Sequence, residues 1–139
     1  MRKKGQLPRI TELAASRITE KIRSGEYSTK LSLQQHKRHV DGTIEYKKYM
    51  QVRQAKGLSP QGILTINDKE AQALIIQKAG TGIITKDVNG NIVPRESITA
   101  DKIIGKTWAG GKLIETNKAR IHYGKTSSHI VPIGGKNYD

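Results

Sequence analysis

The chain has 139 residues, with 25 Lys and Arg against 12 Asp and Glu, which gives a formal net charge of +13. It has no cysteine, so disulfides and thiolate metal sites are excluded, and no apolar run approaches the roughly 18 residues of a membrane span. This length suggests one domain. The excess of positive charge favours a polyanionic partner: nucleic acid first, an acidic protein second and an anionic membrane third.

The N-terminal third is predicted to be mainly helical. The apolar residues that recur there at helical spacing are Ile10, Leu13, Ala14, Ile18 and Ile22. They predict an amphipathic helix that ends before Gly25. Leu31 and Leu33 then alternate with polar residues, which predicts a short strand over residues 30–35. A second helix is predicted to start at Asp41 or Thr43, either of which can cap it, and to end near residue 55.

The middle of the chain alternates strands with one further helix. A strand is predicted over 62–66, followed by a helix over 69–78 that Asn67 or Asp68 caps. Asn89 and Gly90 form the strongest hairpin signal, because Asn-Gly suits a type I′ turn. The arms of this hairpin are predicted at 83–87 and 92–93.

Further strands are predicted at 103–104, 113–116, 120–123 and 129–133, with turns at 110–111 and 117–118. Basic helices thus come first and an antiparallel meander follows. This order predicts an α+β fold with N-terminal helices packed on an antiparallel sheet.

The four histidines fall into two short clusters. His36 and His39 lie in the first, and His122 and His129 lie on the two arms of the last predicted hairpin. If the turn centres on Lys125 and Thr126, His122 pairs with His129, and directly opposed residues point to the same face of a sheet. Arg120 shares that face, because it precedes His122 by two residues.

Histidine clusters fit two chemistries. Four imidazoles could bind zinc, but the neighbouring residues are mostly cationic and positive charge opposes a dication, so we expect no metal and no other cofactor. The alternative is general acid–base catalysis on a phosphodiester of RNA, whose 2′-hydroxyl is its own nucleophile. That reaction needs one base, one acid and cations for the transition state.

The candidate site follows from this chemistry. We expect His39 to approach the hairpin and to act with His122 or His129 as the acid–base pair, while Arg120 steadies the phosphate. The residues expected to bind the substrate are Lys78, Thr81, Lys125, Ser127 and Ser128. Two rival interpretations remain open: a non-catalytic basic domain that binds nucleic acid or an acidic partner, for example as a tail on a phage structural protein, and a DNase, which in most designs needs a metal.

Several motifs together resemble a known family. The matching segments are His39-Val40-Asp41-Gly42-Thr43 with Tyr46-Lys47, Ala79-Gly80-Thr81-Gly82, Ile103-Ile104-Gly105, Ile121-His122-Tyr123 and His129-Ile130-Val131-Pro132. In order and spacing they resemble the polymorphic toxin type 50 family, found at the C-termini of bacterial and phage-borne effectors. Asp41 departs from the family motif, which usually has proline there.

The resemblance covers residues 31–132 and implies a barnase–EndoU–colicin–RelE-like fold. It also implies metal-independent ribonuclease action in the cytoplasm of a target cell and an acidic cognate immunity protein. We expect a toxin domain over 31–139 that is monomeric when free, preceded by a helical segment over 1–30 that belongs to the end of an upstream region.

Overall fold

The computed structural model describes residues 9–10 and 14–134. Its helices are α1 (Ala14–Arg23), α2 (Leu33–Lys37), α3 (Ile44–Ala55) and α4 (Asp68–Lys78). Its strands are β1 (Arg9–Ile10), β2 (Ile63–Leu64), β3 (Ile83–Lys86), β4 (Ile92–Thr99), β5 (Gly105–Ala109), β6 (Lys112–Thr116), β7 (Lys118–His122) and β8 (His129–Ile133). In this part of the chain no helix is long and apolar enough to cross a membrane.

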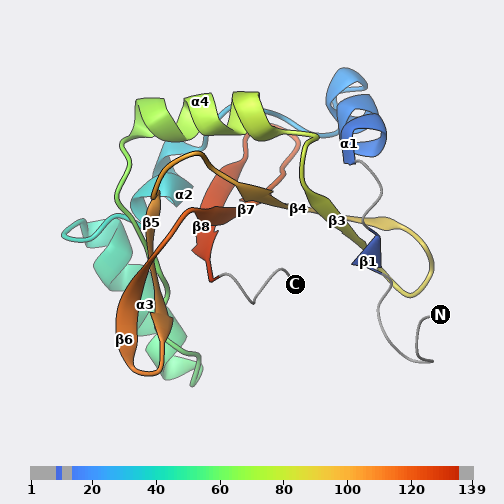
Figure 1. Ribbon diagram of the computed structural model, residues 1–139. Coiled ribbons are helices and arrows are strands. Elements are labelled where there is room, and N and C mark those ends of the chain that lie inside the picture. The colour runs from blue at the N-terminus through green and yellow to red at the C-terminus, as the bar shows by residue number, and fades with distance from the viewer. Residues whose placement is uncertain (1–8, 11–13, 135–139) are drawn as a thin grey trace.

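The strands form two antiparallel sheets. The larger has the order β1-β3-β4-β7-β8 and the smaller has the order β2-β5-β6. Helix α4 lies across one face of the larger sheet, while α3 and the β5–β6 hairpin lie beside each other at one end of the molecule (Figure 1). The predicted α+β fold is confirmed.

The core lies between α4 and the larger sheet. Ala71 and Ile75 on α4 are fully buried, and so are Ile84, Ile121 and Ile130 on three strands of the sheet. Side chains alternate between the two faces of a strand. The residues that alternate with these apolar ones on β7 and β8 therefore point to the opposite face.

The N-terminal segment contributes to the same core. Ile18 on α1 is fully buried, and Tyr27 stacks on Tyr123 with ring centroids 5.0 Å apart. The boundary expected at residue 30 stays a prediction, and the expected helical residues 11–13 lie outside the described residues. Ile10, which we expected in the first helix, lies in β1.

The motif around Gly80 has a structural role in the fold. Glu96 is fully buried and its carboxylate accepts hydrogen bonds from the backbone N–H groups of Gly80 (3.0 Å) and Gly82 (2.7 Å) and from the hydroxyl of Tyr123 (2.7 Å). A Cβ atom at Gly82 would lie 1.9 Å from the carbonyl oxygen of Ser97. Glycine at this position lets β4 approach the segment between α4 and β3 closely.

Two predicted strands are wrong. Residues 33–37 form helix α2, because the Ser32 hydroxyl accepts the backbone N–H of Gln35 and caps a helix there. Leu31 makes only an isolated bridge to Ser128. Ile103 and Ile104 precede β5, and the strand itself starts at Gly105.

Two other details also differ from the predictions. The strand predicted at 92–93 extends to Thr99, even though it contains Pro94. The turn before it is not type I′, because Gly90 has φ 82° and no non-glycine residue of the described chain has positive φ. Asp87 accepts the N–H of Gly90 instead, and its carboxylate accepts those of Asn89 and Asn91.

Candidate functional site

Three adjacent strands place an arginine and two histidines in one row. Arg95 on β4 pairs with His122 on β7, and His122 pairs with His129 on β8, as the hairpin register predicted. The imidazole centroids of His122 and His129 are 4.9 Å apart. Directly opposed residues share one face of a sheet, so this row lies on the face opposite α4. Arg120 lies on the same face of β7, two residues before His122.

His39 reaches the row from the loop after α2. Its ring lies 6.0 Å from that of His129, at an interplanar angle of 14°. The backbone carbonyl of His39 accepts the N–H of Leu64 on β2, and the preceding carbonyl, that of Arg38, accepts the side-chain amide of Gln61. The smaller sheet and the segment before it therefore hold His39 against the larger sheet.

Helix α3 also lies against these residues. The Tyr49 ring lies 6.1 Å from that of His39, and the guanidinium carbons of Arg38 and Arg53 lie 5.6 and 5.9 Å from the Tyr49 centroid. Thr43 starts this helix as predicted, since its hydroxyl accepts the N–H of Tyr46. Tyr49 and Arg53 are four residues apart and so share one face of the helix.

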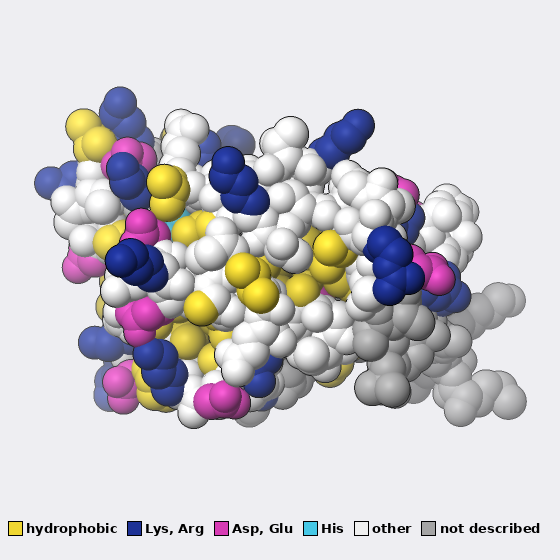
Figure 2. Space-filling model, turned by 90° about the horizontal axis from the view of Figure 1, so that it is seen from above, with side chains coloured by type: hydrophobic (Ala, Val, Ile, Leu, Met, Phe, Trp, Pro, Cys, Tyr) yellow, Lys and Arg dark blue, Asp and Glu magenta, His cyan; other side chains and the backbone are white. Residues whose placement is uncertain are grey.

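These side chains line one cavity with a volume of about 660 Å³. The ionisable groups on its walls, tyrosine apart, are cationic or imidazole: Arg38, Arg53, Arg95, Arg120, His39, His122 and His129. None of the described residues that line it is Asp or Glu. On the face over α4, by contrast, Lys and Arg are dispersed among acidic side chains (Figure 2). The cavity walls therefore concentrate positive charge, which favours an anionic ligand.

The three cavity histidines are held in the neutral form. Burial lowers the pKa of His39 and of His122 to about 3, and it lowers that of His129 to about 4. The charges of neighbouring imidazoles and arginines contribute to these low pKa values, after burial. A general base must be in the neutral form, but a pKa this far below 7 makes an imidazole a weak base.

Two imidazole nitrogens of the cavity histidines lack a hydrogen-bond partner within the described residues. Nδ1 of His39 and Nε2 of His122 are buried and have no hydrogen-bond partner within the described chain. Leaving such an atom without a partner costs free energy, and a bound ligand would supply the missing partner. The same part of the chain contains no group of three or more His, Cys, Asp or Glu residues arranged to hold a metal ion.

Burial of these histidines predicts a loss of stability in mild acid. Their pKa values are lower in the folded chain than the usual 6.5, so the unfolded chain binds more protons below that pH. The free energy of unfolding should fall between pH 7.5 and pH 5.0, by roughly 2 kcal/mol for each buried histidine whose pKa lies below 5. Urea unfolding at the two pH values measures this, and most carboxylates stay ionised at both.

A His122→Asn variant provides the control for this titration. It lacks one of the imidazoles whose pKa is lowered, so its free energy of unfolding should depend less steeply on pH than that of the unchanged chain. Equal free energies of unfolding at pH 7.5 and pH 5.0 in the unchanged chain would contradict the burial of neutral histidines.

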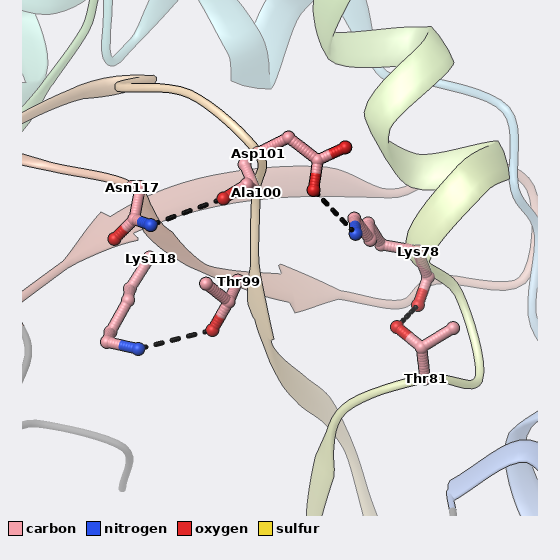
Figure 3. A network of polar contacts seen from close by, with 7 residues as sticks. All are labelled: Lys78, Thr81, Thr99, Ala100, Asp101, Asn117 and Lys118. Carbon is pink, nitrogen blue, oxygen red and sulfur yellow. Dashed lines mark hydrogen bonds and ion pairs between the residues drawn. The ribbon is translucent and has the colours of Figure 1, made fainter.

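The structure brings together His39, His122, His129 and Arg120, which we expected to be the catalytic residues. Two of the expected binding residues lie elsewhere. Lys78 and Thr81 lie at the end of α4, where the Lys78 ammonium is 3.4 Å from the carboxylate of Asp101 and the Thr81 hydroxyl donates to the carbonyl of Lys78 (Figure 3). Neither residue lines the cavity.

The other three expected binding residues belong to the β7–β8 turn. Lys125 is exposed and Ser127 is half-buried, and neither lines the cavity. Ser128 is fully buried. Its hydroxyl donates to the carbonyl of Ser28 and accepts the N–H of Gly124, so it joins the turn to the segment before α2.

Sequence reasoning missed several residues that line the cavity: Arg95, Arg53, Tyr49, Gln61 and Trp108. The four-residue spacing of Tyr49 and Arg53 was a usable signal. Arg95 lies beyond the strand predicted at 92–93 and directly after Pro94, and proline is uncommon inside sheets. Gln61 and Trp108 gave no local signal, because their places depend on how the smaller sheet packs.

The residues of the candidate site lie within a range of the chain that matches a known protein family. The model of the family described as bacterial toxin 50 matches residues 31–132, a range that includes the three cavity histidines and Arg120. No curated protein and no solved structure matches the chain. Because the matched range is well over half of the sequence, the chain belongs to the bacterial toxin 50 family.

Proposed function

We propose that this toxin domain is a metal-independent ribonuclease that cleaves RNA by attack of the 2′-hydroxyl on the adjacent phosphodiester. The observation that carries the proposal is the cavity itself. Three imidazoles from separate segments of the chain face one another there, surrounded by arginines and without a lining carboxylate. Such a set fits a reaction that needs proton transfer and an anionic transition state.

In this reaction one imidazole removes the proton of the 2′-hydroxyl. The oxygen then attacks phosphorus, and the bond to the 5′-oxygen breaks as a second imidazole gives it a proton. The products are a 2′,3′-cyclic phosphate and a free 5′-hydroxyl. Arg120 and Arg95 are placed to stabilise the charge of the phosphorane-like transition state.

The second imidazole must be protonated before it can act as an acid. The neutral state of all three rings supplies the base but not the acid. A phosphate in the cavity opposes the arginine charges and raises the pKa of the nearest imidazole. Binding of RNA would therefore favour protonation of the imidazole that acts as the general acid.

Membership of a toxin family and the net charge of the chain support a proposal for the partner and the place of action. An acidic immunity protein that covers the cavity would neutralise a chain of net charge +13 in the producing cell. The toxin would be delivered from that cell as a monomer and would act in the cytoplasm of the target cell, where RNA is accessible.

Incubating the pure protein with total RNA in EDTA tests this proposal. We expect cleavage of RNA at an unchanged rate when EDTA is added, and no cleavage of DNA, which lacks the 2′-hydroxyl. RNA that is bound but left intact would favour a non-catalytic basic domain. Cleavage of DNA that EDTA abolishes would favour a metal-dependent DNase.

A further inference from the structure

The cavity is larger than a phosphate group requires. Pockets of roughly 300–1,000 Å³ take organic ligands of many atoms, and this cavity of about 660 Å³ falls in that range. Its histidines come from β7, β8 and the loop after α2. Its walls also include Pro60 and Gln61 before β2, and Thr107 and Trp108 on β5. A second part of the ligand can therefore lie against the smaller sheet.

Trp108 lies on this part of the wall and is not part of the hydrophobic core. It is the only tryptophan of a chain that has no phenylalanine, yet 40% of its surface is exposed. Its cross-strand partner is Leu113 on β6, which is also exposed. A large aromatic side chain gains most of its free energy by covering its faces, so an indole that lines an open cavity is suited to cover a flat ligand.

Gln61 adds a polar group to the same wall. Only 5% of its surface is exposed, and its side-chain nitrogen donates to the carbonyl of Arg38. Its oxygen, Oε1, is buried and has no hydrogen-bond partner within the described residues. The charged groups of the cavity are N–H donors that suit the phosphate of a ligand. The unpaired oxygen of Gln61 is an acceptor, so it suits a ligand that also carries an N–H group.

The loop that carries Gln61 is held in place. Arg53 on α3 donates through Nε to the carbonyl of Ser59 at 2.9 Å, and the backbone N–H of Leu58 donates to the carbonyl of Arg53 at 2.9 Å. Hydrogen bonds to Arg53 on α3 and to the carbonyl of Arg38 thus hold this wall on two sides. Such fixed groups bind a ligand with a small loss of conformational entropy.

We propose that this wall is a nucleobase subsite, in which a base stacks on Trp108 and an N–H group of the base donates to Oε1 of Gln61. A nucleotide joins a flat aromatic ring carrying N–H donors to a phosphate, which matches the two parts of the cavity. A base in a duplex is stacked on its neighbours and paired along its edge. The substrate is therefore single-stranded RNA, and this inference rests on the proposed function for the choice of RNA.

Fluorescence of the single tryptophan tests the subsite without any cleavage. The probes are a short single-stranded oligonucleotide with 2′-O-methyl sugars and the same sequence annealed to its complement. We expect the single strand to change the emission of Trp108 saturably and the duplex to bind more weakly without that change. Loss of stacking in a Trp108→Ala variant should weaken single-strand binding by about 5- to 150-fold, measured by anisotropy of a labelled oligonucleotide.

Two further variants control for the fold. Trp108→Phe keeps a stacking ring and should retain most of the affinity, whereas Leu113→Ala removes the exposed cross-strand neighbour and should change it less than about twofold. The subsite is overturned if Trp108→Ala binds the single strand as the unchanged chain does, if the duplex binds equally well, or if neither probe binds.

Failure of the subsite differs from failure of the proposed function. Binding that depends on Trp108 in a chain that never cleaves RNA would support the subsite and refute the ribonuclease. Cleavage with an unchanged KM in the Trp108→Ala variant would support the ribonuclease and refute the subsite, because lost substrate binding raises KM.

Discussion

Replacing His122 or His129 by alanine should lower the rate of RNA cleavage by about 10²–10⁴-fold, the usual contribution of a general acid or base. The centroids of the two rings are 4.9 Å apart, and both rings line the cavity together with His39. The measurement is single-turnover cleavage of a labelled RNA, which separates the chemical step from binding.

His36 offers a matched control for these variants. It is a buried histidine of the same chain that does not line the cavity. A His36→Gln variant that remains folded should therefore cleave RNA at close to the original rate. Rates near that of the unchanged chain in both the His122→Ala and the His129→Ala variants would rule out the acid–base assignment.

The second large effect is expected at Arg120. Replacing it by glutamine should lower cleavage by about 10²–10³-fold, because a fixed cation at the transition-state charge is worth that much in comparable sites. Arg120→Lys should recover only part of the rate, since lysine cannot contact a phosphate in bidentate fashion. Burial and Arg95 lower the pKa of Arg120, but a guanidinium stays protonated at neutral pH.

Lys78→Gln is the control for Arg120→Gln, because it removes the same charge from a residue outside the cavity. Its cleavage rate should stay within about twofold of the original, as is usual for a surface change away from the site. If Lys78→Gln were the more damaging change, the phosphate would bind on the face of α4 and the cavity would not be the active site.

Local patterns predicted the parts of the structure that depend on neighbours in sequence. The β7–β8 hairpin is short, so its turn fixed the register that opposes His122 and His129. Capping residues likewise marked the starts of α3 and α4. The alternation of Leu31 and Leu33 was misleading, since only Leu31 is buried and Ser32 between them caps a helix.

The remaining features depend on packing between distant segments. Sequence alone did not show that α4 covers the face of the sheet opposite the histidines, so Lys78 and Thr81 were expected beside them. Trp108 and Gln61 reach the cavity only because β2 and β5 pair with each other beside the larger sheet. No local pattern encodes that arrangement.

The most direct test of the account is cleavage of an RNA that carries one 2′-deoxy sugar at the mapped cleavage site, in EDTA. If the 2′-hydroxyl is the nucleophile, the unmodified RNA yields a 2′,3′-cyclic phosphate end and the modified one resists cleavage at that position. Equal cleavage of both RNAs, or products that lack a cyclic or derived 3′-phosphate end, would contradict the proposed mechanism of the histidine cavity.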